Sequence, residues 1–356
     1  MPPETYDYAD RRRRHGDPSL SIVVIEAGSD VSNRADVLEG LPQKQLGGRS
    51  IANAAGKVLR GSTAINAGAL TRGDKQNYDH WVNVAKDSRW SYDGLLPYFR
   101  KFETFHDSHG DANSHRFDGP IKEITPHERR RTPGVAEMIE DRLDGQRIVA
   151  PFIYPLDGVD VVTNTLVKRV IIKDISSKKV ATAVELADNE TGIAADREFI
   201  VSTGAYRSPQ VLMLSGLGPK DELDKHAIDV YGAPDVGLHL HDHLRVLQWW
   251  KLKNPEKGLD WSVPKQGLLD ALAADGNLDN AAVASQRSHP EKWIMSMYYP
   301  AGTLSMGEVV DTDMRVKGVE GLHVVDASVI PVPLAGHLQN CIYAMAEQAA
   351  DIILNH

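Results

Sequence analysis

The sequence predicts an α/β fold. Short β-branched, apolar runs alternate with longer stretches of helical periodicity, a pattern typical of a largely parallel sheet covered by helices. The run SIVVIEAG over residues 21–28 ends in an acid, Glu26, as does the second strand of a dinucleotide-binding βαβ unit, where the acid binds a ribose hydroxyl. Small residues also stand where other strands give way to helices, which is typical of anion-binding turns.

The first half of the chain is predicted to hold one strand and a long helical region. Residues 19–28 are expected to form the strand, and residues 29–55 a loop punctuated by glycine and asparagine. Residues 56–73 indicate a turn rich in small residues that leads into a helix. Aromatic residues recur at helical spacing over 77–105, which favours packing in the core.

The second half is predicted to alternate between strands and helices. The expected elements are consecutive strands over 159–174 and 178–188, a strand, tight turn and helix over 197–218, a strand entering a proline-rich turn over 321–333, and a helix over 339–354. In the third of these, Ser208 is expected to cap the helix and Pro209 to occupy its first position.

Composition and charge restrict the possible partners. The net charge of −9 argues against nucleic acid, because phosphate binding needs a basic face. The run Arg11 to Arg14 is predicted to be the solvated end of a helix. The single cysteine, Cys341, excludes an internal disulfide framework. Because no apolar stretch is long enough to span a bilayer and no apolar signal region begins the chain, we expect a cytoplasmic protein without a membrane partner.

Two turns have the composition of anion-binding sites. In LRGSTAIN (59–66), the backbone N–H groups of Gly61, Ser62 and Thr63 could face an anion at a helix N-terminus. Gly204 and Ala205 stand at a similar place in STGAYRSPQVL. Either turn taken alone is also consistent with a plain connection between a strand and a helix.

A histidine cluster raises an alternative of a different kind. In VGLHLHDHL (236–244), a strand would place His239, His241 and His243 on one face, and imidazole is a common zinc ligand. The motif is similar to the HxHxDH signature of the metallo-β-lactamase superfamily, with a spacing one residue short. A metal-dependent hydrolase that uses these three histidines therefore remains an alternative.

The C-terminal region places two polar side chains beside regular elements. Asp326 ends a predicted strand, and His337 directly precedes the last helix. A histidine at such a position is commonly a cap or a solvated side chain. Because imidazole titrates near neutral pH, a general base is the functional interpretation.

Several motifs together resemble the glucose-methanol-choline (GMC) family of FAD-dependent oxidoreductases, of the fungal alcohol and aryl-alcohol oxidase type. The matching segments occur in the family's order over most of residues 6–82, 155–258 and 293–356. They are IVVIEAG, GKVLRGSTAINAGALTRGDKQNYDHW, STGAYRSPQVLMLSGLGP, VGLHLHDH, YPAGTLSMG, VVDASVIP and the helix after His337. This resemblance also explains the histidine cluster, because Asp242 and His243 then belong to a structural turn.

The resemblance implies a two-part architecture and a set of FAD ligands. Residues 1–80, 155–245 and 308–356 would form a discontinuous, Rossmann-like FAD-binding domain, and residues 81–154 and 246–307 a reduced α+β substrate domain. By similarity, Glu26 would meet the adenosine ribose, the Val167 backbone the adenine, and the start of the last helix the flavin N1/C2 carbonyl region. The full set of implied cofactor-binding residues is Glu26, Gly61, Ser62, Asn66, Val167, Gly204, Asp326, Ala327 and Gln339.

The chemistry that the resemblance implies is oxidation of a small-molecule alcohol. A histidine takes the hydroxyl proton while the carbon-bound hydrogen leaves as hydride to flavin N5. His337 matches one position of the family's catalytic pair. The other position holds Tyr299 rather than histidine, and a phenol that ionises near pH 10 is a poor base at neutral pH. Tyr299 could hydrogen-bond the substrate oxygen, leaving His337 to act alone.

The chain departs from the family in its first βαβ unit. Tyr6, Asp7 and Tyr8 match the start of that unit, but no GxGxxG occurs anywhere, and Arg60 stands where the family has glycine. We therefore expect the first strand and the glycine-rich loop to be missing and FAD binding to be weak or lost. A non-catalytic GMC-derived relic or an interaction protein is the resulting alternative.

Overall fold

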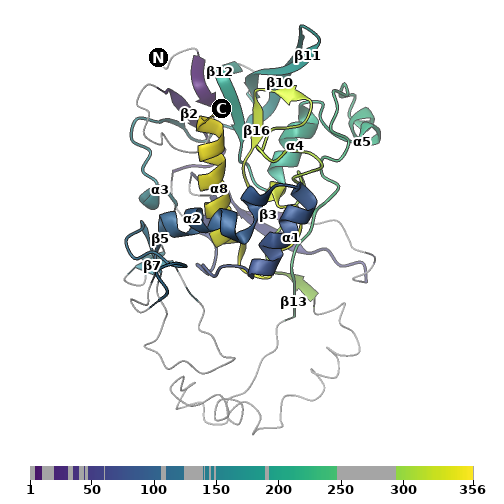
Figure 1. Cartoon of the computed structure of the whole chain (residues 1–356). Helices are drawn as coiled ribbons and strands as arrows, with labels where there is room; N and C mark the ends of the chain where they lie inside the picture. The colour runs from purple at the N-terminus through teal and green to yellow at the C-terminus, as the bar shows by residue number, and fades with distance from the viewer. Residues whose placement is uncertain are drawn as a thin grey trace.

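One mixed sheet with helices packed against it organises the molecule, as seen in a computed structural model (Figure 1). This arrangement confirms the predicted α/β class. The structure describes residues 5–9, 20–30, 35–39, 44, 47–59, 61–105, 110–123, 139, 141–143, 146–147, 150–188, 192–246 and 294–355.

Among these described residues, eight strands join in the main sheet. Their order is β10-β11-β12-β1-β2-β9, with β15 beside β11 and β16 beside β12. The strands are β1 (Thr5–Ala9), β2 (Ile22–Ile25), β9 (Asp160–Val162), β10 (Val167–Ile175), β11 (Lys178–Leu186), β12 (Gly192–Val201), β15 (Val319–Glu320) and β16 (Leu322–Val324). β10, β11 and β12 form an antiparallel meander, whereas β9, β2, β1, β12 and β16 pair in parallel.

The central place in the parallel part is taken by β1, so the expectation that the first strand is missing is wrong. Thr5 pairs with Ala194 of β12, and Tyr8 pairs with Ile22 of β2. The hydrogen bonds of a β-ladder use backbone groups only. This segment can therefore occupy the position between β2 and β12 whatever side chains it carries. Ten residues, 10–19, separate β1 from Leu20, and they contain no glycine-rich phosphate loop.

The parallel register brings the carboxyl ends of three strands to one edge of the sheet. Glu26 follows β2, Ser202 follows β12, and Asp326 lies two residues beyond β16. Open α/β sheets bind their ligands outside the carboxyl ends of the strands. This carboxyl edge is therefore the place at which to look for a site.

The elements outside the sheet agree with most sequence predictions. They are β3 (Ala35–Glu39), β4 (Ala52–Gly56), η2 (Gly61–Ala64), α1 (Lys75–Ala85), η3 (Ser88–Trp90), α2 (Tyr92–Phe102), β5 (Glu103–Thr104), β6 (Ile121–Lys122), β7 (Arg142–Leu143), β8 (Gln146–Arg147), α3 (Ala150–Ile153), α4 (Arg207–Leu214), α5 (Lys220–Lys225), β13 (Leu244–Val246), β14 (Ile294–Ser296), η6 (Ala327–Val329) and α8 (Leu338–Leu354). No helix among the described residues is long and apolar enough to cross a bilayer.

Two local predictions need correction. The segment 29–55, expected to be loop, contains the antiparallel pair β3–β4, because its alternating pattern is too short to stand out among glycines and asparagines. Ser208 does not cap α4 but lies inside it, since the helix begins at Arg207. The arginine run 11–14 lies outside the described residues.

Helix α8 runs through the centre of the molecule (Figure 1). Most of its side chains are buried, which confirms the predicted C-terminal helix. Its last turn, at Ile353 and Leu354, packs against Leu20 and Ile22 at the start of β2. The first turn of α8 therefore lies toward the other end of β2, on the side of the carboxyl edge.

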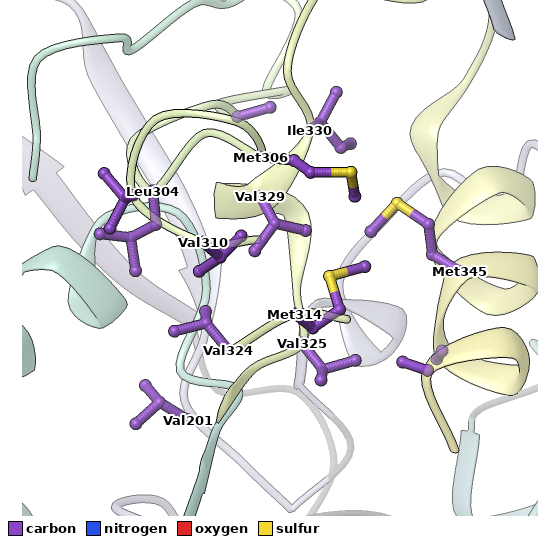
Figure 2. Close-up of a cluster of buried hydrophobic side chains, with 14 of the residues drawn as sticks. Val201, Leu304, Met306, Val310, Met314, Val324, Val325, Val329, Ile330 and Met345 are labelled. Atoms are coloured by element: carbon purple, nitrogen blue, oxygen red, sulfur yellow. The ribbon is translucent and has the colours of Figure 1, made fainter. Parts of the chain in front are cut away.

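The core has an aliphatic and an aromatic part. Figure 2 shows Met306 and Met314 from the segment after β14 meeting Met345 of α8, with valines of β12 and β16 beside them. Most aromatic residues of α1, η3 and α2 are fully buried, with Tyr78 in edge-on contact with Trp81 and Phe99, while Tyr92 and Tyr98 are partly buried against the same cluster. These contacts confirm the prediction that the aromatics over 77–105 pack in the core.

A buried ion pair joins β5, which directly follows α2, to the loop that precedes α1. The carboxylate of Glu103 is 1% exposed and lies 2.6 Å from Nη2 of Arg72, whose side chain is 11% exposed. Nδ1 of His115 lies 2.9 Å from the other carboxylate oxygen, and Arg72 also donates to the carbonyl of Ser114. Because both charges are removed from water, the loss of either partner would leave the other uncompensated.

We predict that Glu103→Gln lowers the free energy of unfolding by about 3–5 kcal/mol, the usual cost of removing one partner of a buried pair. The measurement is urea unfolding at pH 7. Asp93→Asn is the matched control, because the Lys75–Asp93 pair is exposed and should contribute little. Equal effects of the two substitutions would contradict the prediction.

Candidate functional site

The loop 66–73 lies along the first turn of α8, and three hydrogen bonds join the loop to this turn and its cap. Nδ2 of Asn66 donates to Oε1 of Gln339 at 2.7 Å, and Oγ1 of Thr71 lies 2.7 Å from Nδ1 of His337. Nδ2 of Asn340 donates to the carbonyl of Leu70. Two residues that the family resemblance implies to be cofactor-binding, Asn66 and Gln339, are thus in direct contact.

His337 precedes α8 in the N-cap position, but its side chain makes no capping hydrogen bond. The half-buried ring instead faces Thr71 on one side and Tyr299 on another, with ring centroids 5.8 Å apart and planes at 72°. Burial lowers the pKa of His337, and the nearby His243 lowers it further. The imidazole is therefore neutral at pH 7 and able to accept a proton.

Tyr299 packs against two imidazoles. Its ring centroid is 5.5 Å from that of His243, at 75°, and 5.8 Å from that of His337. The preceding residue, Tyr298, has a φ of 62°, a strained backbone conformation for a bulky side chain. The two sequence-predicted catalytic residues, His337 and Tyr299, are therefore neighbours, and the structure adds His243 to them.

Asp242 holds this arrangement in place. One carboxylate oxygen accepts from the backbone N–H groups of His243 at 2.7 Å and Tyr299 at 2.9 Å, and the other accepts from the hydroxyl of Ser296. A single carboxylate thus links the turn at 242–243 to the strand β14 and the residues that follow it. The position of both rings depends on this link.

The amide of Gln339 also contacts a buried carboxylate. Nε2 of Gln339 donates to Oδ2 of Asp141, whose side chain is fully buried. The backbone of Asp141 in turn donates to the carbonyl of Gly68, and Oδ1 of Asn66 accepts from the N–H of Gly68. These bonds fix the orientation of both amide side chains at the start of α8.

Asp326 and Gly204 meet at the carboxyl edge. Oδ2 of Asp326 accepts from the N–H of Gly204 at 2.8 Å and from the hydroxyl of Ser208, while Oδ1 caps η6 at Ser328. The carbonyl of Ala327 accepts from the N–H of Gly302. Three residues assigned to the cofactor by sequence, Gly204, Asp326 and Ala327, therefore lie together.

Glu26 and the start of β10 form a second group at this edge. Glu26 is 4% exposed, and Oε1 accepts from the N–H of Gly28 at 2.8 Å. The N–H of Thr165, two residues before Val167, donates to the carbonyl of Glu26. The residues assigned to the adenosine end thus come from two distant segments that share a contact.

The segment 57–62 packs closely on the end of β2. A Cβ atom at Gly28 would lie 2.2 Å from the carbonyl oxygen of Lys57, so only glycine fits there. Gly61 and Ser62 begin the four-residue 3₁₀ helix η2, and the hydroxyl of Ser62 accepts from the N–H of Gly56. Helix α1 follows this small-residue turn, as the sequence predicts, and Arg60 lies outside the described residues.

The three histidines of the alternative metal site do not converge. Residues 234–239 form a turn instead of a strand, so their side chains do not share a face. His239 lies 3.9 Å from Asp235, His241 contacts the carbonyl of Ile330, and His243 packs on Tyr299. Among the described residues there is no group of three His, Cys, Asp or Glu side chains placed to hold a metal ion.

Three site residues were not found by sequence reasoning. Thr71 and Asp141 contact the predicted site through the tertiary structure alone, and nothing in their local pattern marks them. His243 was assigned to a structural turn. His243 directly follows Asp242, and Asp242 also binds the backbone of Tyr299. This link between His243 and Tyr299 is visible only in the folded chain.

Family models of the GMC oxidoreductases match most of the chain. The N-terminal GMC oxidoreductase model matches residues 21–143 and 146–245, and the C-terminal model matches residues 264–346. The fold is also similar to the solved structure of a fungal aryl-alcohol oxidase. The two superpose with a TM-score of 0.82 and 19% sequence identity, over 99% of each chain.

Two relatives match along nearly their whole length. A GMC-type oxidoreductase of Aspergillus aculeatus is 28% identical, over 94% of each chain, and a pyridoxine 4-oxidase of Microbacterium luteolum is 25% identical, over 93% of this chain and 94% of that one. The first alignment spans 494 positions, more than the 356 residues of this chain, so the relative carries internal segments that are absent here. The chain therefore belongs to the GMC oxidoreductase family, whose members are FAD flavoproteins that oxidise alcohols.

Proposed function

We propose that this FAD-dependent oxidoreductase oxidises a primary alcohol or a related CH–OH substrate, with His337 as the base. The observation that carries the proposal is the neutral, half-buried imidazole of His337 at the start of α8, held at Nδ1 by Thr71 and flanked by Tyr299. Relatives named choline dehydrogenase and pyridoxine 4-oxidase support a small alcohol as substrate.

The residues present fit FAD at its two ends. At Gly204, with a φ of 88°, a Cβ atom would meet nothing within 4 Å, so there is open space beside Asp326. Within the described residues, the buried hydroxyl of Ser29 near Glu26 and Oδ1 of Asn340 in α8 have no hydrogen-bond partner. Such groups are available to a bound ligand. The glycine-rich pyrophosphate cradle is the part that the sequence lacks.

In the proposed assignment, Glu26 and Val167 hold the adenosine end, and Gly61, Ser62, Gly204, Asp326 and Ala327 lie toward the middle of the cofactor. Asn66 and Gln339 face the flavin. All strands of the main sheet fall within residues 1–80, 155–245 and 308–356, which supports our proposal that these segments form the FAD-binding domain. Residues 81–154 and 246–307 would form the substrate domain.

The chain's own contribution to the reaction is proton transfer and orientation. His337 accepts the hydroxyl proton of the alcohol, which raises electron density on the oxygen and eases departure of the hydride from carbon. In this proposal Tyr299 hydrogen-bonds the same oxygen, and Asp242 accepts a hydrogen bond from the Tyr299 backbone. Bound FAD would supply the hydride acceptor. The helix N-terminus that follows His337 favours negative charge nearby.

We expect FAD to bind weakly, because the pyrophosphate lacks its backbone N–H cradle. The protein should lose flavin absorbance during gel filtration, yet its melting temperature should rise with added FAD. At a concentration 100-fold above the dissociation constant, the stabilisation should be about 2.7 kcal/mol. Stoichiometric flavin after gel filtration would refute weak binding, and no stabilisation at any FAD concentration would favour the non-catalytic alternative.

Replacement of the base should remove the chemistry. We predict that His337→Gln lowers the rate of alcohol-dependent flavin bleaching by about 10²–10⁴-fold, the usual contribution of general base catalysis. Stopped-flow absorbance with FAD in excess measures this rate. His226→Gln, on an exposed part of α5's C-terminus, is the control. An unchanged rate in His337→Gln would exclude this residue as the base.

The pH dependence should report the electrostatic effect of His243 on His337. The base acts when deprotonated, so kcat/KM rises with pH through the pKa of His337, which burial and His243 lower from its ordinary value of 6.5. In His243→Asn this pKa rises, and the acid limb of the profile moves to higher pH. His239→Asn, which removes an exposed histidine, should leave the limb in place. An acid limb that does not move in His243→Asn would contradict the prediction.

A further inference from the structure

We propose that Thr71 is a positioning residue that fixes His337 as the Nδ1–H tautomer and leaves Nε2 as the proton acceptor. The inference rests on the proposed function, since it concerns the base of that reaction. Its starting observation is the 2.7 Å contact between Oγ1 of Thr71 and Nδ1 of His337, a contact between two residues 266 positions apart in sequence.

The hydrogen-bonding partner of Nδ1 determines which nitrogen of the neutral His337 imidazole can accept a proton. A neutral imidazole carries one N–H donor and one acceptor nitrogen, so the partner of one nitrogen sets the role of the other. When Nδ1–H donates to the hydroxyl oxygen of Thr71, the lone pair remains on Nε2. After Nε2 has taken the alcohol proton, Nδ1–H still donates to the same oxygen. One hydrogen bond therefore serves both protonation states of His337.

The backbone on both sides of Thr71 is held, so its hydroxyl stays in place. The N–H of Leu70 donates to the carbonyl of Ile139, and the carbonyl of Leu70 accepts from Nδ2 of Asn340. On the other side, the buried guanidinium of Arg72 is bound by the carboxylate of Glu103. Thr71 thus lies between two anchored neighbours, one of them tied to the first turn of α8.

The ring of His337 depends on this hydrogen bond. As the residue before α8, it makes no side-chain cap bond, and its contact with Tyr299 is an edge-on ring contact at 72° that does not distinguish the two nitrogens. Within the part of the chain that the structure describes, the Thr71 hydroxyl is the hydrogen-bond partner of the imidazole. Without it, the ring could flip, and the tautomer preferred in water would return.

The test measures the tautomer directly. The full-length protein is labelled with ¹⁵N-histidine, and two-bond ¹H–¹⁵N spectra are recorded above the pKa of His337, whose signals are assigned by their loss in His337→Gln. We expect a protonated Nδ1 and an unprotonated Nε2 in the wild type and in Thr71→Ser. Thr71→Val should show protonated Nε2 as the main or a mixed form. A protonated Nε2 in the wild type, or an unchanged spectrum in Thr71→Val, would overturn the proposal.

A matched control separates this effect from a general loss of a hydroxyl. Thr182→Val removes a hydroxyl of the distant strand β11 that donates to the carbonyl of Ile171 in β10, and it should leave the His337 signals unchanged. With FAD in excess, kcat/KM in Thr71→Val should fall by at least about 10-fold and recover in Thr71→Ser, since the wrong tautomer cannot accept the proton. A protein that shows the Nδ1–H tautomer but oxidises no alcohol would support the role of Thr71 and refute the proposed function alone.

Discussion

The contact between the loop 66–73 and the first turn of α8 is the constraint on which the candidate site depends. Asn66, Leu70 and Thr71 each bond a different residue of that turn or its cap, so the loop and the helix hold one another. The buried Arg72–Glu103 pair anchors the loop, and the apolar side chains of α8 anchor the helix in the main hydrophobic core. Side chains that must meet a ligand are therefore carried on elements with little freedom to move.

Asp242 imposes a second constraint on the site. Its carboxylate binds the backbone of His243 and Tyr299 and the hydroxyl of Ser296, and a carboxylate that accepts several N–H bonds holds its turn firmly. The strained φ of Tyr298 persists because these bonds surround it. The site thus joins two rigid supports, one bearing His337 and the other bearing Tyr299. This division explains how the two rings come to lie near one another.

The sheet shows how a fold can outlast the loss of a ligand-binding motif. β1 keeps the central position and both parallel ladders, although only ten residues connect it to the described start of the β2 segment. Strand pairing requires backbone groups and a chain of suitable direction, whereas a pyrophosphate cradle requires glycines at defined positions. The first requirement is easily met by a neighbouring segment. The second cannot be met without the glycines themselves, so the sheet keeps its strand order although the sequence lacks the glycine-rich loop.

The sequence by itself determined the α/β class, the C-terminal helix, the buried aromatic residues and the family, because apolar periodicity and motif order are local or linear properties. It also predicted that Asn66 and Gln339 bind the cofactor and that His337 and Tyr299 act in catalysis, since the family's motifs carry that information. Only the tertiary structure decided that β1 fills the sheet, that His239, His241 and His243 point to different partners, and that Thr71 and Asp141 reach the first turn of α8. Strand pairing between distant segments and side-chain contacts across hundreds of residues leave no periodic trace in the sequence, because they depend on how the folded elements pack.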